Sequence, residues 1–326
     1  MQCKSKKEEW NWHPQFPIEN NPIFLWPFDF KKIIKWYIPM WLTFSETIFC
    51  LLIALIFWNF LQPTALAFKE IDFQLISFIY LRNIGLTFFI AGGLHFYLYY
   101  LRGQKNLLRY DIRDLSKGKR FFLGSQLKDN IFWTIISGVT IWTLYEVLFM
   151  WSYANNFITQ IFWKDDAFLF CLVFFFMFTW MSIHFYFIHR LLHLPILYKL
   201  FHSVHHRNTN TGPWSGISMH PIEHIFYFSS VLIHFIIPSH PLHILFHLIV
   251  ASQGAIIGHA GFDAIIFKKN KKIALAHFYH HLHHRYFECN YGALEVPFDL
   301  WFGTFHDGTS KKEKYMRAKR FKIHKN

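Results

Sequence analysis

The sequence predicts an all-α polytopic membrane protein with four transmembrane helices, a further kinked apolar hairpin and a cytosolic helical cap rich in histidine. Three observations support this fold class. The 326 residues are 53% apolar and include 41 phenylalanines, more than a water-soluble core of this size can bury. Several apolar runs are long enough to cross a bilayer. The 22 histidines concentrate from position 184 onward, near the end of the fourth of these runs.

Four apolar runs are each expected to form a transmembrane helix, because about 20 apolar residues span the hydrocarbon core. The first run contains Glu46, the second contains Arg82, and the fourth has no formal charge after Asp166. The runs cover, approximately, residues 37–61, 73–101, 130–153 and 166–188.

The connecting segments differ in positive charge, and this difference predicts the orientation. The loops 62–72 and 154–166 carry one lysine each. Since Lys and Arg accumulate in cytosolic loops, we expect the N-terminus, the loop 102–128 and everything from His189 onward on the cytosolic side. The basic residues on this side include Lys31, Lys32, Lys35, Arg102, Lys105, Arg109, Arg113, Lys117, Lys119 and Arg120.

Residues 221–261 are apolar but interrupted by Pro238 and Pro241, which break a helix or bend it. We interpret this segment as one kinked hairpin that enters the membrane from the cytosolic face, with two full crossings as the alternative. The end of the chain is a basic tail, expected in solvent or at the membrane surface. The expected division is residues 1–36 as a cytosolic N-terminal segment, 37–164 as transmembrane helices with a basic loop, 165–308 as a histidine-rich domain and 309–326 as the tail.

Three histidine clusters follow the fourth run: HRLLH at 189–193, HSVHH at 202–206 and HFYHHLHHR at 277–285. Histidines three or four residues apart lie on one face of a helix. One such pair is more often a core feature than a ligand pair, but three on one side of the membrane predict a metal site. Neutral imidazole suits iron, zinc and copper, and eight of them could hold two divalent ions. The four cysteines form no CxxC pair, so we expect nitrogen ligands.

The third cluster contains two overlapping HxxHH patterns. One is His277, His280 and His281, and the other is His280, His283 and His284. At about 100° per residue, each set covers a similar arc of a helix. Helical geometry alone therefore leaves both patterns open.

These three clusters, together with NYG at 290–292 and FGT at 302–304, resemble the fatty acid hydroxylase and sterol desaturase superfamily over about residues 165–308. The stretch GPWSGISMHPIEH at 212–224 resembles bacterial-type sterol desaturase-like members in particular. The resemblance implies a membrane di-iron oxidoreductase that uses O2 and external electrons to hydroxylate or desaturate a sterol-like, acyl or ether lipid. It implies no catalytic residue beyond the metal ligands.

The resemblance also implies a ligand set. In C-5 sterol desaturases the asparagine of NYG lies six residues after the last histidine of the third cluster. Asn290 lies six residues after His284, which favours the second pattern and leaves His281 out. The implied ligands are His189, His193, His202, His205, His206, His259, His280, His283 and His284.

Four further residues are expected as extra ligands or as contacts of ligands. His277 shares the face of the third cluster, and Asp263 stands where hydroxylases have a second histidine after the one matched by His259. Glu223 is expected to hydrogen-bond a ligand imidazole, which would fix the tautomer. His220 and Glu223 also match the HxxEH pattern of zinc peptidases, but Pro221 makes His220 a helix-entry residue.

The expected cofactors are two iron ions, with O2 as co-substrate. The expected partners are a lipid, the membrane and a separate electron donor: a b-type cytochrome, a ferredoxin or a reductase that uses NADH or NADPH. We expect no nucleic-acid partner, because the basic clusters flank apolar spans. The alternative functions are a histidine-rich metal transporter and a zinc-dependent membrane hydrolase. Transport sites usually lie at mid-membrane with acidic partners, whereas these clusters follow a span end.

Overall fold

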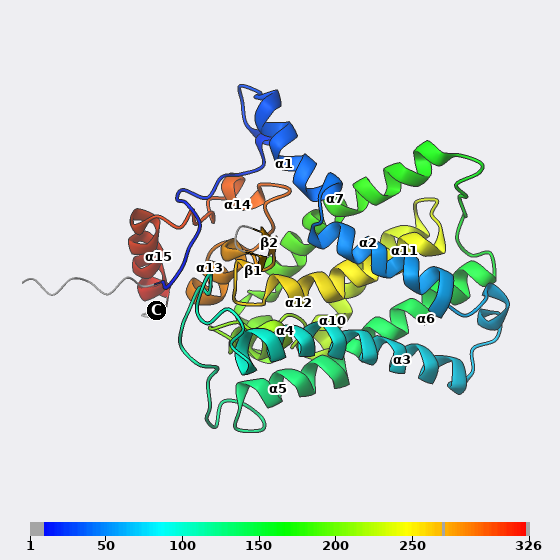
Figure 1. Cartoon of the computed structure of the whole chain (residues 1–326), viewed down its shortest axis with the longest axis horizontal. Helices are drawn as coiled ribbons and strands as arrows, with labels where there is room; N and C mark the ends of the chain where they lie inside the picture. The colour runs from blue at the N-terminus through cyan, green and yellow to red at the C-terminus, as the bar shows by residue number, and fades with distance from the viewer. Residues whose placement is uncertain (1–9, 269–270, 324–326) are drawn as a thin grey trace, which may run out of the picture.

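The computed structural model describes residues 10–268 and 271–323, and it is mostly helical (Figure 1). The longer segments are often α-helices continued by π-helical turns. The α-helices are α1 (Phe30–Leu42), α2 (Glu46–Ile56), α3 (Phe73–Thr87), α4 (Gly93–His95), α5 (Gln126–Trp133), α6 (Thr140–Ala154), α7 (Ala167–Leu192), α8 (Pro195–Leu197), α9 (Ser203–His206), α10 (Pro221–Phe228), α11 (Pro241–Ile249), α12 (Ala255–Gly258), α13 (Phe278–Tyr286), α14 (Phe298–Trp301) and α15 (Ser310–Ile323).

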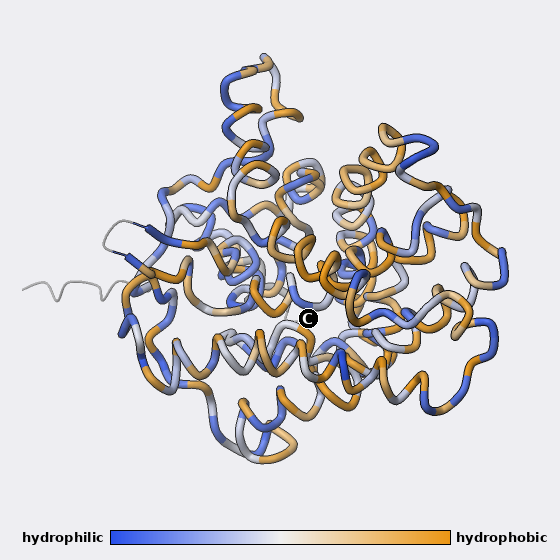
Figure 2. The backbone as a smooth tube through the Cα atoms, turned by 45° about the vertical axis from the view of Figure 1, so that its right-hand side comes forward, coloured by the Kyte–Doolittle hydropathy of each residue, from blue (hydrophilic) through white to orange (hydrophobic). Residues whose placement is uncertain are grey.

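Within the described residues, five helices are long and apolar enough to cross a membrane. Hydrophobic residues run along these helices, and hydrophilic residues gather in the connecting loops (Figure 2). The prediction of a mostly helical, multi-pass membrane protein is therefore confirmed. Four of the five helices overlap the predicted runs, and the fifth lies inside the predicted hairpin. The five helices are Phe30–Leu61, Phe73–Tyr100, Gln126–Ala154, Ala167–Leu192 and Pro241–Gly258.

The first span begins seven residues earlier than predicted and is interrupted. Its first part, α1, starts where Asp29 accepts hydrogen bonds from the N–H groups of Lys31 and Lys32. Ser45 then caps a new helix, α2, by accepting a hydrogen bond from the N–H of Ile48 at 3.3 Å. A side-chain oxygen at an N-cap satisfies a backbone donor that the first turn leaves unpaired, which favours a restart of the helix at this point. Helix α1 consequently projects from the bundle (Figure 1).

The segment 221–261 forms two helical arms that bend at the prolines, a shape common to the predicted hairpin and to its alternative of two crossings. The first arm is α10 continued by a 3₁₀ helix, Ser229–Phe235, and the second arm is α11 continued to α12. At the tip, the N–H of Ser239 donates to the carbonyl of Thr159 at 3.0 Å. The tip therefore touches the loop 154–166 at the far end of the bundle. Helix α11 contacts α2, α6 and α7, and its span is 83% buried, so its apolar residues pack against other helices.

A cap of short elements lies at the opposite end of the bundle, around α13, α14 and α15 (Figure 1). It includes an antiparallel hairpin of β1 (Ala264–Lys268) and β2 (Lys271–Ala274), with Ala264 opposite Ala274. The all-α prediction omits this hairpin, whose short strands are favoured by the β-branched residues Ile265, Ile266 and Ile273. The loop 102–128 packs against the cap, where the Tyr110 hydroxyl donates to the carbonyl of Ala276 at 2.7 Å.

Candidate metal centre

Nine histidines converge into two adjacent groups where the cap meets the ends of the spans. Within each group, one potential ligand atom per residue lies within 4.8 Å of all the others. All but two of the nine are buried, and those two, His193 and His280, are partly buried. The first group is His189, His193, His202, His206 and His283, and the second is His205, His259, His280 and His284.

Paired histidines in the sequence supply both groups at once. His205 belongs to the second group and His206 to the first, and His283 and His284 divide in the same way. Adjacent helical residues point about 100° apart, so a HisHis pair on α9 or α13 faces two sites that lie side by side. The HH dipeptides of the clusters therefore place two sites next to each other.

Distances in the first group suit a shared metal ion. The Nε2 atom of His193 lies 3.2 Å from that of His202 and 3.2 Å from that of His206. The Nε2 atoms of His206 and His283 are 3.0 Å apart. Two nitrogens bound at right angles to one metal, with bonds of about 2.1 Å, lie about 3.0 Å apart. Four imidazoles of this group are thus already spaced as ligands.

The second group has the same spacing. The Nε2 atom of His259 lies 3.0 Å from that of His284 and 3.1 Å from that of His280. His205 completes the group, with its ring centroid 4.6 Å from that of His284.

Hydrogen bonds on the opposite ring nitrogen orient several of these imidazoles. His189 Nδ1 donates to the carbonyl of Tyr291 at 2.6 Å, and His283 Nδ1 donates to the carbonyl of Cys289 at 2.6 Å. Since a carbonyl only accepts, these Nδ1 atoms carry the proton and the Nε2 atoms keep a lone pair. The Nε2 atom of His189 is buried and has no hydrogen-bond partner among the described residues. A buried lone pair without a donor fits a metal ligand.

A carboxylate orients a third imidazole of the first group. His202 Nδ1 donates to Glu223 Oε1 at 2.7 Å, and both side chains are 2% exposed. Glu223 comes from the first turn of α10, so the first arm of the hairpin supports the site.

The imidazoles outside the spans are held neutral by burial. Desolvation disfavours the charged ring and lowers its pKa, and neighbouring imidazoles lower it further in each case. Neutral rings offer the lone pairs that a cation needs. Burial lowers the pKa well below its usual value in His202, His205, His206, His280, His283 and His284.

Comparison with known proteins shows which family the histidine-bearing part of the chain resembles. A fatty acid hydroxylase family model matches residues 174–304, which include all nine histidines. Over these residues the chain is similar to the fatty acid hydroxylase and sterol desaturase superfamily. The resemblance predicted from the sequence is thereby confirmed.

The relatives include two desaturases and a decarbonylase. A Delta(7)-sterol 5(6)-desaturase of Gibberella zeae is 35% identical over 36% of this chain and 37% of its own length. A Delta(7)-sterol 5(6)-desaturase of Eremothecium gossypii is 29% identical over 41% of this chain and 37% of its own length. A very-long-chain aldehyde decarbonylase of Arabidopsis thaliana is 33% identical over 38% of this chain and 22% of its own length. The chain thus spans little more than a third of the desaturases' length. No solved structure matches it.

The NYG and FGT motifs of this fatty acid hydroxylase domain hold the carbonyls that orient the first group. Asn290, at a φ of 52°, donates through Nδ2 to the carbonyls of Tyr279 at 3.0 Å and His306 at 3.1 Å. It therefore links α13 to the segment after FGT. The chain turns sharply between α13 and Asn290, with Phe287 at a φ of 68°, and this turn brings the carbonyl of Cys289 back to His283.

Asp299 joins the two motifs, and sequence reasoning did not identify it. Its carboxylate accepts hydrogen bonds from the N–H groups of Tyr291 at 2.9 Å and Gly292 at 2.7 Å, and from the hydroxyls of Tyr279 at 2.8 Å and Thr304 at 2.5 Å. The only signal in the sequence is an acidic residue three positions before FGT. Asp299 holds the backbone around Tyr291, whose carbonyl accepts from His189.

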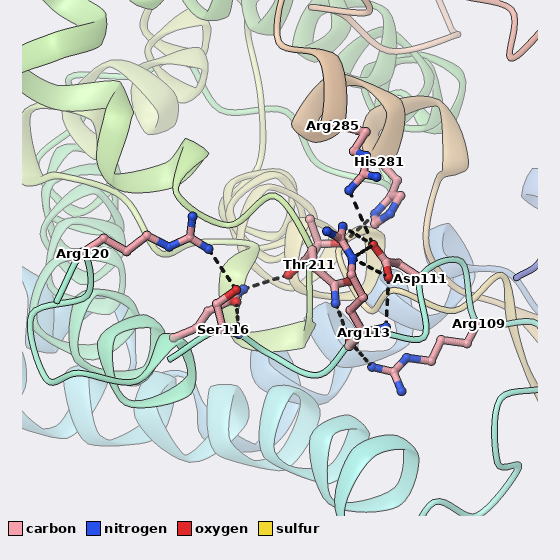
Figure 3. A network of polar contacts seen from close by, with 10 residues as sticks. Arg109, Asp111, Arg113, Ser116, Arg120, Thr211, His281 and Arg285 are labelled. Atoms are coloured by element: carbon pink, nitrogen blue, oxygen red, sulfur yellow. Dashed lines mark hydrogen bonds and ion pairs between the residues drawn. The ribbon is translucent and has the colours of Figure 1, made fainter. Parts of the chain in front are cut away.

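His281, left out of the predicted ligand set, lies outside both groups. Its Nδ1 atom lies 3.0 Å from the hydroxyl of Thr211, and its ring packs against Trp10 and Tyr110. Close by, Asp111 accepts hydrogen bonds from the side chain of Arg113 and lies 3.8 Å from the guanidinium of Arg285 (Figure 3). This side of α13 therefore fastens the helix to the basic loop.

Of the four expected supporting residues, only Glu223 hydrogen-bonds to one of the nine histidines through its side chain, and the side chains of the other three lie outside both groups. His277 precedes α13 with its side chain 64% exposed, and its Nε2 atom is 4.0 Å from a carboxylate oxygen of Glu46. Asp263 forms an ion pair with Lys272 at 3.6 Å. His220 caps α10 by accepting from the N–H of Ile222 at 3.2 Å, as expected of a helix-entry residue.

Proposed function

We propose that this chain is a membrane-bound di-iron oxygenase that hydroxylates or desaturates a lipid with O2 and electrons from a separate carrier. The observation that carries the proposal is the pair of adjacent, all-nitrogen histidine groups in a fatty acid hydroxylase domain. The named relatives act on sterols and on very-long-chain aldehydes, which supports an apolar substrate.

The first group would hold one metal and the second group the other. Structural zinc sites are usually tetrahedral and rich in cysteine, whereas here five imidazoles converge on one site and four on its neighbour. Imidazole suits iron, and a pair of irons would supply the activation of O2 that an unactivated C–H bond requires.

The residues of the chain would position and isolate this chemistry. The carbonyls of Tyr291 and Cys289 and the Glu223 carboxylate would keep the Nδ1 protons of three imidazoles in place, so that their Nε2 atoms face the metal. Burial of the groups would exclude water. Because His189 lies at the end of the span α7, an apolar substrate could reach the site from the lipid without entering water.

The orientation, the domain division and the electron donor belong to the same proposal. The positive charge of the loop 102–128, which packs on the cap, supports a cytosolic position for the cap, the N-terminus and the histidines. Residues 165–308 would form the catalytic unit, between the membrane helices 37–164 and the basic tail 309–326. Electrons would come from a b-type cytochrome, a ferredoxin or a reductase on the cytosolic side.

Lipid mass spectrometry tests this function. Cells that express the chain should accumulate a lipid that has gained one oxygen atom or lost two hydrogen atoms, and His283→Ala should abolish the new lipid. His281→Ala is the matched control, because it removes an imidazole from the same helix that belongs to neither group. An iron-free protein with full activity in the absence of O2 would contradict the proposal.

A further inference from the structure

Helix α1 carries an uncovered apolar stripe. None of its 13 residues is buried, and the helix projects from the bundle (Figure 1). Four apolar side chains that follow one another at intervals of four residues are between 43% and 76% exposed: Phe30, Ile34, Ile38 and Leu42. Residues at this spacing are neighbours on a helix surface, so the four form one continuous stripe. A contiguous exposed apolar patch marks a contact with a membrane or with another protein.

A basic stripe runs beside the apolar one. Lys31 and Lys35 each follow a member of the apolar stripe by one residue, which places them about 100° around the helix, and Lys32 lies beyond them. All three lysine side chains are exposed. The nearby Asp29 carboxylate caps the helix by accepting hydrogen bonds from two backbone N–H groups. An apolar face next to lysines is typical of a helix that lies in the interface between lipid and water.

The length of the first apolar helical segment also indicates that α1 lies at the edge of the hydrocarbon core. The segment Phe30–Leu61 has 32 residues, which extend about 48 Å in a straight helix, whereas the core is about 30 Å thick. The part from Glu46 to Leu61 alone extends about 24 Å. Since Ser45 caps a new helix at this point, α1 is free to take a direction of its own.

Contacts at both ends of α1 give its position. Asn21 donates through Nδ2 to the hydroxyl of Tyr37 at 2.8 Å and to the carbonyl of Glu295, in the segment after NYG, at 2.8 Å. In the last turn of the helix, the Trp41 ring lies 4.3 Å from that of Phe175 on the span α7. The helix therefore runs obliquely from the cap towards the spans, with its lysines in the half nearer the cap.

We propose that α1 is an interfacial anchor that lies in the membrane leaflet on the side of the cap and binds anionic phospholipid there. The apolar stripe lies among the acyl chains, and the three lysines meet the phosphates of anionic headgroups. Trp26, just before the helix and 83% exposed, lies at headgroup depth, where tryptophan is enriched. Because Asn21 links α1 to the cap, the anchor fixes the height of the histidine groups relative to this leaflet.

The reactivity of two neighbouring positions tests the anchor. Single cysteines are introduced as Ile34→Cys or Lys35→Cys in the full chain. Cys3→Ser and Cys171→Ser form the background, because the other two native cysteines are buried. In nanodiscs that hold one chain each, a membrane-impermeant maleimide should react with Lys35→Cys at least about tenfold faster than with Ile34→Cys, because acyl chains shield the second position.

Other positions of α1 predict other results. A helix that crosses the membrane along its normal holds Ile34 and Lys35 within about 1.5 Å of the same depth, so both cysteines would react slowly. A helix in water would let both react fast. Equal rates of either kind would overturn the anchor. One chain per nanodisc excludes a second copy of the chain as the cover of Ile34.

Selectivity among lipids tests the role of the lysines. The chain is reconstituted in phosphatidylcholine bilayers, and the association of spin-labelled phosphatidylglycerol with it is compared with that of spin-labelled phosphatidylcholine. The ratio of the two association constants should fall at least about twofold in the triple variant Lys31→Gln, Lys32→Gln and Lys35→Gln. In the unmodified chain the ratio should fall as salt is raised.

A triple variant on α15 is the matched control: Lys311→Gln, Lys312→Gln and Lys314→Gln remove the same charge from the cap and should leave the ratio unchanged. An equal fall in both triple variants, or a fall in neither, would overturn the contact with anionic headgroups. Both measurements need no bound metal and no turnover, so the anchor and the proposed function fail or stand separately.

Discussion

The two histidine groups are alike in spacing but differ in what orients them. In the first group, His189 and His283 are held by carbonyls of the segment after α13, and His202 is held by Glu223 of α10. In the second group, His259 donates to the carbonyl of Ala255, four residues earlier in its own helix, at 2.7 Å. The first group therefore depends on contacts between distant segments, whereas the orienting hydrogen bond of His259 in the second group is local.

The largest expected effects come from removing one ligand of each group. His283→Ala should remove metal from the first group, and His205→Ala should remove metal from the second. Each should lower lipid turnover more than about 100-fold, because the proposed chemistry would need both irons. Iron per chain, measured by elemental analysis, should fall to about half in both variants.

A result in which either variant keeps its full iron content and activity would contradict the assignment of the two groups.

Asp299→Asn should affect the first group selectively. The Asp299 carboxylate accepts from four donors, whereas an asparagine side chain has one acceptor oxygen and an NH2 group that itself donates. Some of the buried N–H and O–H groups would therefore lose their acceptor, and each loss should lower the free energy of unfolding by about 1–3 kcal/mol. We expect a lower melting temperature and loss of iron from the first group before the second. Metal release to a chelator, followed over time, should become biphasic.

Asp307→Asn is the control, because the Asp307 carboxylate accepts hydrogen bonds from the N–H and the hydroxyl of Thr309, which is not one of the four donors to Asp299. If Asp299→Asn released both metals together, the selective dependence of the first group on this segment would be wrong.

A smaller effect is expected at Glu223. Glu223→Gln keeps an acceptor for His202 but removes the charge, so metal affinity in the first group should fall about tenfold, whereas Glu223→Ala should lower it about 100-fold. Competition with a chelator of known affinity measures both changes. Equal affinity in Glu223→Ala and the unmodified chain would show that the carboxylate does not support the ligand.

The smallest effect on activity is expected at His281. His281→Ala should leave turnover within about twofold, because the ring lies outside both groups. It should nevertheless lower the free energy of unfolding by about 1–3 kcal/mol, since a buried aromatic contact with Trp10 and a hydrogen bond with Thr211 are lost. If His281→Ala lost as much activity as His283→Ala, the assignment of ligands on α13 would be wrong.

The spans and eight of the nine converging histidines could be predicted because their signals are local. Long apolar runs mark the helices, and spacings of three and four residues mark the faces of α9 and α13. His259 has no neighbouring histidine at such a spacing, and only the resemblance to the family identified it as a candidate ligand. The bend of the hairpin followed from Pro238 and Pro241, which constrain the backbone wherever they occur.

The other features depend on contacts between distant segments. Asp299 gains its role only when NYG and FGT fold onto one carboxylate, and one acidic residue in a loop carries no pattern. The division of His205 and His206 between two groups also needs α13 and α12 in place. The break before Ser45 was missed because the apolar run continues through it, while capping is decided by one side chain.

The central claim is that two separate histidine groups each hold one iron. The most direct measurement is the metal content of the unmodified chain purified in its membrane from aerobically grown cells. We predict two iron ions per chain, with zinc and copper well below one. A single metal per chain, or zinc in place of iron in a chain that still converts lipid, would contradict the account.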